Sequence, residues 1–262
     1  MRSRLSHTVA NLVWHMWLNR LRLVQRRTVR CPTFLSSFCF VALLVSPIAW
    51  WCRFGESFLC LTKRQPAEIL VVEGWIGRAG VRAAAAEFER GSYRYVVTTG
   101  GLTDAKGWIE PGWSYARGAA DELLRLGVRQ DRIIVAPAAD AKSQRTYNSA
   151  VAARRALDSF EIRPPALNVF TLGPHARRSR LVYAKVEAPG TKVGVISWVP
   201  SIDKAGPWWR SSDRAKALLT ETACYMYEAL LDSGRGFNPA VGSASSVAAQ
   251  HFSLMANAAK LK

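Results

Sequence analysis

The feature that most constrains the fold is the regular alternation, from Glu68 onward, of short apolar runs with longer amphipathic stretches. Such runs are typical of the buried strands of a parallel sheet, and the stretches between them are typical of helices that cover its faces. We therefore predict an α/β fold with a Rossmann-like, doubly wound, mainly parallel five-stranded sheet over residues 66–231. The predicted strands are 68–73, 95–100, 132–137, 167–172 and 192–197, and the predicted helices are 79–90, 114–126, 145–157, 177–186 and 212–231.

A second constraint is the uncharged apolar segment 31–52, which is long enough to cross the hydrocarbon core of a bilayer. Trp50 and Trp51 at its end suit the aromatic belt of a membrane interface. The segment ends in Trp-Trp-Cys and lacks the small residues that a signal-peptide cleavage site needs. We therefore predict one uncleaved N-terminal transmembrane helix.

The positive charge is concentrated before this helix. Residues 1–64 hold ten Lys and Arg and one acidic residue, so they carry +9 of the net charge of +17. We predict that residues 1–30 form a basic cytoplasmic or interfacial segment and, by the positive-inside rule, that the α/β domain lies on the extracytoplasmic side. Charge alone would also suit nucleic acid, but no nucleic-acid-binding motif is present, so we expect no such partner. The Gly- and Ser-rich residues 232–262 predict a flexible tail.

Ligands of open α/β sheets bind outside the carboxyl ends of the strands, so the residues that follow each strand are the candidates. The segments there are "EGW", "TTGG", "SQRTYNSA" and "GPHARRS". None of them is a GxGxxG or P-loop fingerprint, and tight turns are an alternative interpretation of the glycines. The candidate catalytic residues are His175 and Glu73, and the candidate ligand-binding residues are Gly100, Gly101, Arg145, Thr146, Asn148 and Arg178.

The residue types indicate an anion. An arginine in the first turn of a helix opposes the helix dipole, so Arg145 and Arg178 are unfavourable there unless an anion shares the site. Ser143 or Thr146 would cap the helix that Arg145 begins. His175 suits a general acid or base, or an anion contact, and a histidine hydrogen-bonded within a loop is the alternative.

Other features near these residues are assigned no ligand role. We expect Arg177 and Arg180 to point to solvent. A metal site would need His175 with Glu73, Asp104 or Glu110, so we assign no metal ligands and name no cofactor. The tryptophans of "PWWRSS", residues 207–212, would either cover the site or pack against the sheet.

The order of these motifs resembles the SanA/YdcF/ElyC-like family of bacterial envelope domains over nearly all of residues 68–231. The resemblance rests on a strand followed by Gly-Gly, then "LGV…RIIV", S-x-x-T-x-N and T-x-x-x-H-x-x-R. It implies a Rossmann-like domain behind one helix in the bacterial inner (plasma) membrane, with a role in envelope biogenesis. One soluble relative is associated with binding S-adenosylmethionine, and no reaction is assigned to the family.

The sequence also departs from that family. Glu73, Gly74 and Trp75 stand where many relatives have a Gly-rich turn, and Arg145 stands where a polar neutral residue is usual. We predict a membrane-anchored protein that binds an anionic, phosphate-bearing ligand, such as a lipid-linked envelope precursor, with membrane lipid as a further partner. The alternatives are a non-catalytic assembly factor and a cytoplasmic-facing binder of S-adenosylmethionine or a nucleotide. Whether the protein is an enzyme stays open at this point.

Overall fold

The computed structural model describes residues 33–101, 113–139, 144–201 and 206–231. The chain divides into two compact units, residues 1–49 and 50–262. The predicted basic segment 1–30 and the predicted tail 232–262 lie outside the described residues, as do Asp104, Glu110 and Ser143.

The first described helix, α2 (Phe34–Leu59), covers residues 34–52 of the predicted span 31–52 and continues beyond it. It is long and apolar enough to cross a membrane, and no part of its apolar window is buried by other described residues. The prediction ended at Cys52, but the helix runs seven residues further, through Arg53 and Glu56 to Leu59. The last turn stays helical because Leu59 is buried against Trp208 and Leu218, which gives this end of the helix a packed face.

A five-stranded sheet forms the centre of the second unit, and every strand pair in it is parallel. Its strand order is β3-β2-β1-β4-β5, so the order reverses between β1 and β4. Glu73 is the last residue of β1 and therefore lies at this reversal. The strands are β1 (Ile69–Glu73), β2 (Tyr95–Gly100), β3 (Ile133–Pro137), β4 (Ala166–Leu172) and β5 (Lys192–Trp198).

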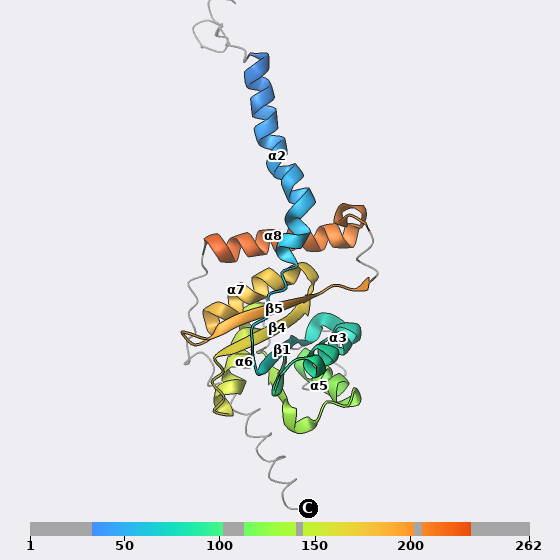
Figure 1. The fold of residues 1–262 in the computed structure, drawn as a ribbon, viewed down its shortest axis with the longest axis vertical. Coiled ribbons are helices and arrows are strands. Elements are labelled where there is room, and N and C mark those ends of the chain that lie inside the picture. The colour runs from blue at the N-terminus through green and yellow to red at the C-terminus, as the bar shows by residue number, and fades with distance from the viewer. Residues whose placement is uncertain (1–32, 102–112, 140–143, 202–205, 232–262) are drawn as a thin grey trace, which may run out of the picture. The chain divides into compact units, whose positions relative to one another are not determined.

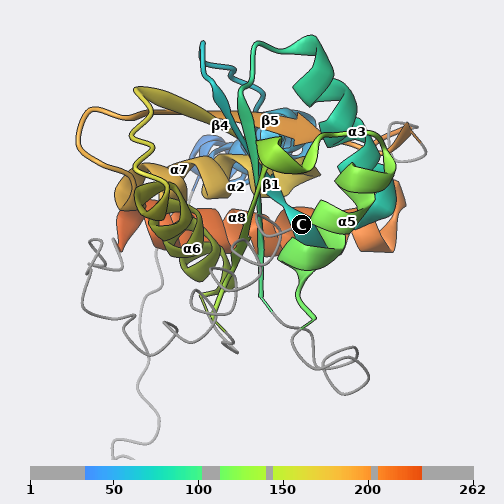
Figure 2. The same ribbon diagram turned by 90° about the horizontal axis from the view of Figure 1, so that it is seen from below.

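Helices cover both faces of the sheet (Figures 1 and 2). Helices α3 (Gly77–Arg90) and α5 (Tyr115–Arg125) pack on the face that carries Leu70 and Val72 of β1. Helices α6 (Arg145–Ser159) and α7 (Ala176–Val186) pack on the face that carries Ile69 and Val71. Because successive residues of a strand point to opposite faces, β1 supplies both cores and is buried throughout. The α/β prediction is confirmed, and the predicted strand and helix ends agree with the structure to within about two residues.

A further helix, α8 (Ser212–Leu230), packs on the outer side of α7 (Figure 1). The turn before it, η5 (Trp208–Arg210), holds the tryptophans of the "PWWRSS" segment. Trp208 is buried with Leu59 and Leu218, and its Nε1 donates to the carbonyl of Cys52 at 3.0 Å. Trp208 therefore neither covers the site nor packs against the sheet, and both expectations for it are wrong. The reason is that the last turns of α2 supply an apolar neighbour that the sequence pattern did not show.

Candidate functional site

Two short turns place the candidate residues at the reversal of strand order. The 3-10 turn η1 (Gly74–Ile76) follows β1 directly, and the 3-10 turn η3 (Gly173–His175) follows β4 directly. Since β1 and β4 are hydrogen-bonded neighbours, both turns leave the sheet side by side. This brings the carboxylate of Glu73 and the imidazole of His175 to the same edge.

The imidazole of His175 lies between two carboxylates. Its Nδ1 is 2.8 Å from Oε1 of Glu221, and its Nε2 is 3.5 Å from Oε2 of Glu73. Nε2 is also 3.4 Å from the hydroxyl of Thr146. The contacts on Nε2 are longer than a good hydrogen bond, whereas the contact on Nδ1 is short. The ring is thus held firmly on one side and loosely on the other.

Arg178 joins the same cluster from the next turn of α7. Its Nε donates to Oε2 of Glu221 at 2.8 Å and its Nη2 donates to Oε1 at 3.0 Å, which is a bidentate pair. Its Nη1 donates to the hydroxyl of Thr146 at 3.0 Å. Nη2 is also 2.9 Å from Nδ1 of His175, so Nδ1 either accepts from Arg178 or donates to Glu221, depending on the tautomer.

The pairing changes the acidity of Glu221. Burial raises the pKa of its carboxyl, but the hydrogen bonds from His175 and Arg178 outweigh burial and hold that pKa at about 2. Burial likewise opposes the charge of Arg178, and the hydrogen bond to Glu221 raises the pKa of Arg178 above its ordinary value. Glu221 therefore stays ionised at neutral pH, and much of the positive charge of Arg178 is compensated within the protein.

Glu73 is 1% exposed and is held by hydroxyl groups. Ser179 donates to its Oε1 at 3.1 Å, and Thr171 donates to its Oε2. Behind it, the hydroxyls of Tyr183 and Thr99 are 3.3 Å apart. Burial, and then the nearby charge of Glu73, raise the pKa of Tyr183 well above its ordinary value. These contacts hold the buried carboxylate of Glu73 as a hydrogen-bond acceptor next to the imidazole of His175.

Trp75 forms an aromatic wall beside His175. The two ring centroids are 5.0 Å apart and the ring planes meet at 81°, in an edge-to-face arrangement. Trp75 is 37% exposed, so one part of the indole faces outward while another contacts the imidazole. The segment Glu73-Gly74-Trp75, which begins at the last residue of β1, thus supplies two side chains to this site.

The structure therefore brings together four of the predicted residues, namely Glu73, Thr146, His175 and Arg178. Thr146 does not cap α6, because its hydroxyl is used by Arg178 and His175 and because the residue before the helix, Gln144, makes no side-chain cap. The expectation that Thr146 would act as a cap is wrong for that reason.

The other predicted residues have different surroundings. Gly100 ends β2 with φ of 136°, and a Cβ there would lie 2.7 Å from Cβ of Tyr115. The carbonyl of Gly101 accepts from the backbone of Tyr115 at 3.1 Å. Arg145 is exposed at the first residue of α6 and makes no ion pair with the described residues, and Asn148 is half-buried one turn later. Their assignment as ligand contacts stays a prediction.

Arg177 and Arg180 do not point freely to solvent, so that expectation is wrong. The guanidinium of Arg177 lies 3.7 Å from the ring centroid of Phe58, and its Nε donates to the carbonyl of Phe58 at 2.5 Å. Nε of Arg180 donates to the carbonyl of Val193 at 3.0 Å. Both side chains are half-buried because neighbouring backbone carbonyls accept their hydrogen bonds.

Sequence reasoning missed Glu221, Ser179 and Thr171. Thr171 begins the T-x-x-x-H-x-x-R motif and Ser179 lies one turn after His175, so their spacing was a usable signal. Glu221 lies on α8, 46 residues from His175, and nothing local connects the two. Among the described residues, no group of three or more His, Cys, Asp and Glu side chains is arranged to hold a metal ion.

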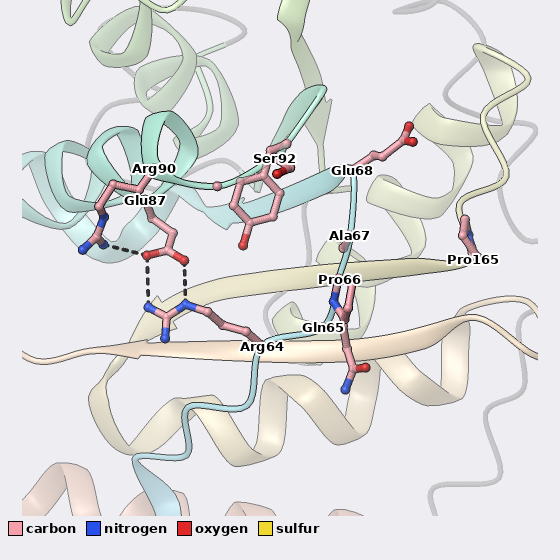
Figure 3. Close-up of a pocket in the computed structure, with 11 residues that line it drawn as sticks. Arg64, Gln65, Pro66, Ala67, Glu68, Glu87, Arg90, Ser92 and Pro165 are labelled. Carbon is pink, nitrogen blue, oxygen red and sulfur yellow. Dashed lines mark hydrogen bonds and ion pairs between the residues drawn. The ribbon is translucent and has the colours of Figure 1, made fainter.

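A cavity of about 870 Å³ lies at the opposite edge of the sheet, where β1 and β2 begin (Figure 3). Glu87 lies on its wall and accepts from Nε of Arg64 at 2.7 Å and from Nη2 of Arg90 at 2.7 Å. The hydrogen bond from Arg64 is the main cause that lowers the pKa of Glu87. The Arg64–Glu87 pair fastens the segment after α2 to α3, and Lys63 adds an antiparallel bridge to Val195.

Comparison of the sequence with models of protein families and with curated proteins finds no match.

Proposed function

We propose that this protein is a membrane-anchored envelope protein that binds a phosphate-bearing ligand at the reversal of strand order, with His175 exchanging a proton with the ligand. The observation that carries this proposal is the placement of His175 between Glu221 at 2.8 Å and Glu73 at 3.5 Å. Ligands of open α/β sheets bind at this point of the fold.

The asymmetry of the imidazole contacts suits acid–base chemistry. Glu221 holds Nδ1 in the way that a carboxylate orients the histidine of a hydrolase triad. Nε2 has only long contacts, so a ligand hydroxyl, a water or a phosphate oxygen is able to replace them. In this scheme Arg178 is a positioning residue, because its guanidinium orients both Glu221 and Thr146.

Three helix starts at the same edge of the sheet support an anionic ligand. Helices α3, α6 and α7, which follow β1, β3 and β4, begin without a side-chain hydrogen bond to their first N–H groups. By contrast, Ser114 caps α5 and Ser211 caps α8. The first N–H groups of an uncapped helix donate readily to a phosphate, although in α7 the N–H of Ala176 already donates to the carbonyl of Gly173. The exposed Arg145 adds a positive charge to the start of α6.

The apolar helix α2 favours a lipid-linked phosphate over a soluble one, because it would keep the domain close to the membrane. The main alternative is a non-catalytic assembly factor. It is favoured by the internal pairing of Arg178 with Glu221, which is also what a purely structural cluster would show.

The test is thermal melting of the full chain in lipid nanodiscs with phosphate, pyrophosphate, a prenyl pyrophosphate, a nucleotide or S-adenosylmethionine. Pyrophosphate or the prenyl compound is expected to raise the melting temperature, because a ligand that binds the folded state stabilises it. Arg145→Ala should reduce the shift. Lys192→Ala is the matched control, since Lys192 is an exposed cation at the amino end of β5 and should leave the shift unchanged.

A shift with only S-adenosylmethionine would contradict the phosphate-ligand proposal, and a shift with only the nucleotide would contradict a lipid-linked ligand. No shift with any compound would contradict the phosphate-ligand proposal and would favour the assembly factor. His175→Gln separates binding from chemistry: it should keep the melting shift but abolish hydrolysis of the prenyl pyrophosphate, in which water attacks a phosphorus atom and the P–O–P bond breaks to give prenyl phosphate and phosphate. If His175→Gln hydrolysed the prenyl pyrophosphate at the wild-type rate, His175 would have no role in the chemistry.

A further inference from the structure

Beyond its first turns, where Asp213 and Lys216 are exposed, helix α8 has its charged side chains on the inward face. Glu221 points to His175 and Arg178, and Glu228 points to Lys185, whose Nζ also donates to the carbonyl of Glu228 at 2.7 Å. After Lys216, these two glutamates are the only charged residues up to the end of the helix. Both are therefore turned toward α7 rather than toward solvent.

The outward face of α8 is apolar. Its large side chains are strongly exposed, and no charged residue lies between them. They are Leu219 at 57%, Met226 at 46%, Tyr227 at 48%, Leu230 at 70% and, just beyond the helix, Leu231 at 69%. A helix on the surface of a water-soluble domain has the reverse polarity, with its apolar stripe inward and its charges outward. An outward apolar stripe of this kind marks contact with an apolar partner.

The place of α8 in the fold indicates which partner. The helix packs against the last turns of α2, where the rings of Phe58 and Tyr225 are 5.6 Å apart. Nη2 of Arg214 is 2.7 Å from a carboxylate oxygen of Glu56. Phe58 is eight residues after Trp50, or about 12 Å along a helix at 1.5 Å per residue. The contact of α8 with α2 therefore lies near the outer edge of the headgroup layer, which extends roughly 5 to 8 Å beyond the hydrocarbon core on each side.

The charges around the apolar face also suit a bilayer. Arg210 and Lys216 are exposed at the start of α8 together with one acidic residue, Asp213, and Arg53 is exposed on α2. Basic residues beside an apolar helix face are typical of helices that lie in a membrane interface, where they contact anionic headgroups. The exposed rings of Trp209 and Tyr227 are residue types enriched at that depth.

We propose that the outward face of α8, formed by Leu219, Met226, Tyr227, Leu230 and Leu231, lies in the interface of the membrane that α2 spans. The same helix then contacts lipid on one side and supplies Glu221 to His175 on the other. The candidate site is therefore one helix thickness from the headgroups. This inference needs α2 to span the membrane, but it does not depend on the ligand or the chemistry proposed above.

The test uses spin labels on the full chain in nanodiscs of phosphatidylethanolamine and phosphatidylglycerol. The five native cysteines are replaced by serine or alanine, and single labels are attached in Leu219→Cys, Met226→Cys and, as a control, Phe160→Cys. Phe160 is 62% exposed at the end of α6 and is not part of α8. Each labelled chain must keep the melting temperature of the parent, which shows that the fold is intact.

Accessibility of each label is measured to oxygen, which concentrates in lipid, and to a polar nickel chelate, which stays in water. Labels at positions 219 and 226 should be several-fold more accessible to oxygen than to nickel, and the label at position 160 should show the reverse. If the labels at positions 219 and 226 were, like the label at position 160, more accessible to nickel than to oxygen, α8 would lie in water and the proposal would be overturned. Protection of positions 219 and 226 from both reagents would also overturn it, because a second copy or another segment of the chain would then cover the face.

Discussion

Nδ1 of His175 lies 2.8 Å from a carboxylate oxygen of Glu221, although the two residues are 46 positions apart in the chain. The contact joins the turn after β4 to α8, a helix outside the two layers that cover the sheet. Arg178 binds the same carboxylate through two nitrogens. The stability of α8 on the domain and the geometry of the imidazole are therefore linked through one side chain.

The first prediction concerns this linkage. Glu221→Ala should lower the free energy of unfolding by roughly 3 to 5 kcal/mol, because it leaves the guanidinium of Arg178 buried without its partner. Glu221→Ala combined with Arg178→Leu should be more stable than Glu221→Ala alone, since no uncompensated charge remains. Thermal melting of the single and double variants measures this. Strictly additive losses would show that the two residues are not coupled.

The second prediction is a loss of stability in acid. The pKa of Glu221 is about 2 in the folded protein and is expected near its ordinary 4.5 in the unfolded chain. A lowered pKa contributes stability above pH 4.5, and this contribution is lost as the pH falls from 4.5 toward 2. The lowered pKa of Glu221 contributes on the order of 3 kcal/mol to the free energy of unfolding. Glu221→Gln should show a shallower fall in melting temperature between pH 6 and pH 3, and equal slopes would contradict the assignment.

The third prediction has the opposite sign and concerns Glu187. Burial raises its pKa from 4.5 to about 7, although Arg154 lies 3.6 Å away and partly offsets this. The folded protein then binds the proton more tightly than the unfolded chain, so stability falls as pH rises from 4.5 to 7. Glu187→Gln should remove this fall and be more stable than wild type at pH 8. Melting at pH 5, 6 and 8 measures the effect, and parallel curves for the two proteins would refute it.

The fourth prediction concerns the turn that carries Trp75. A Cβ at Gly74 would lie 2.2 Å from the carbonyl oxygen of Tyr115, which is backbone and cannot move aside easily. Gly74→Ala should therefore destabilise the protein by about 1 to 3 kcal/mol. Gly101→Ala is the matched control, because its Cβ would find its nearest neighbour at an ordinary 3.5 Å. A similar melting temperature for both variants would show that η1 adapts.

Much of the fold was predictable because parallel strands are buried on both faces and read as short apolar runs. The runs "YVVTTG" and "KVGVIS" predicted strands whose ends agree with the structure to within one residue. Glu73 and His175 were predictable as neighbours for a related reason: each follows a strand, and the carboxyl ends of parallel strands share one edge of the sheet.

The sequence by itself determined the class of the fold, the apolar N-terminal helix and the identity of four residues of the candidate site. It did not determine the strand order, because five apolar runs of similar length carry no mark of which neighbour each one pairs with. It also did not determine that Glu221 neutralises Arg178, that Phe58 lies under Arg177, or that the apolar face of α8 is turned outward. These depend on contacts between residues far apart in the chain, and only the packing of α2 and α8 around α7 brings them together.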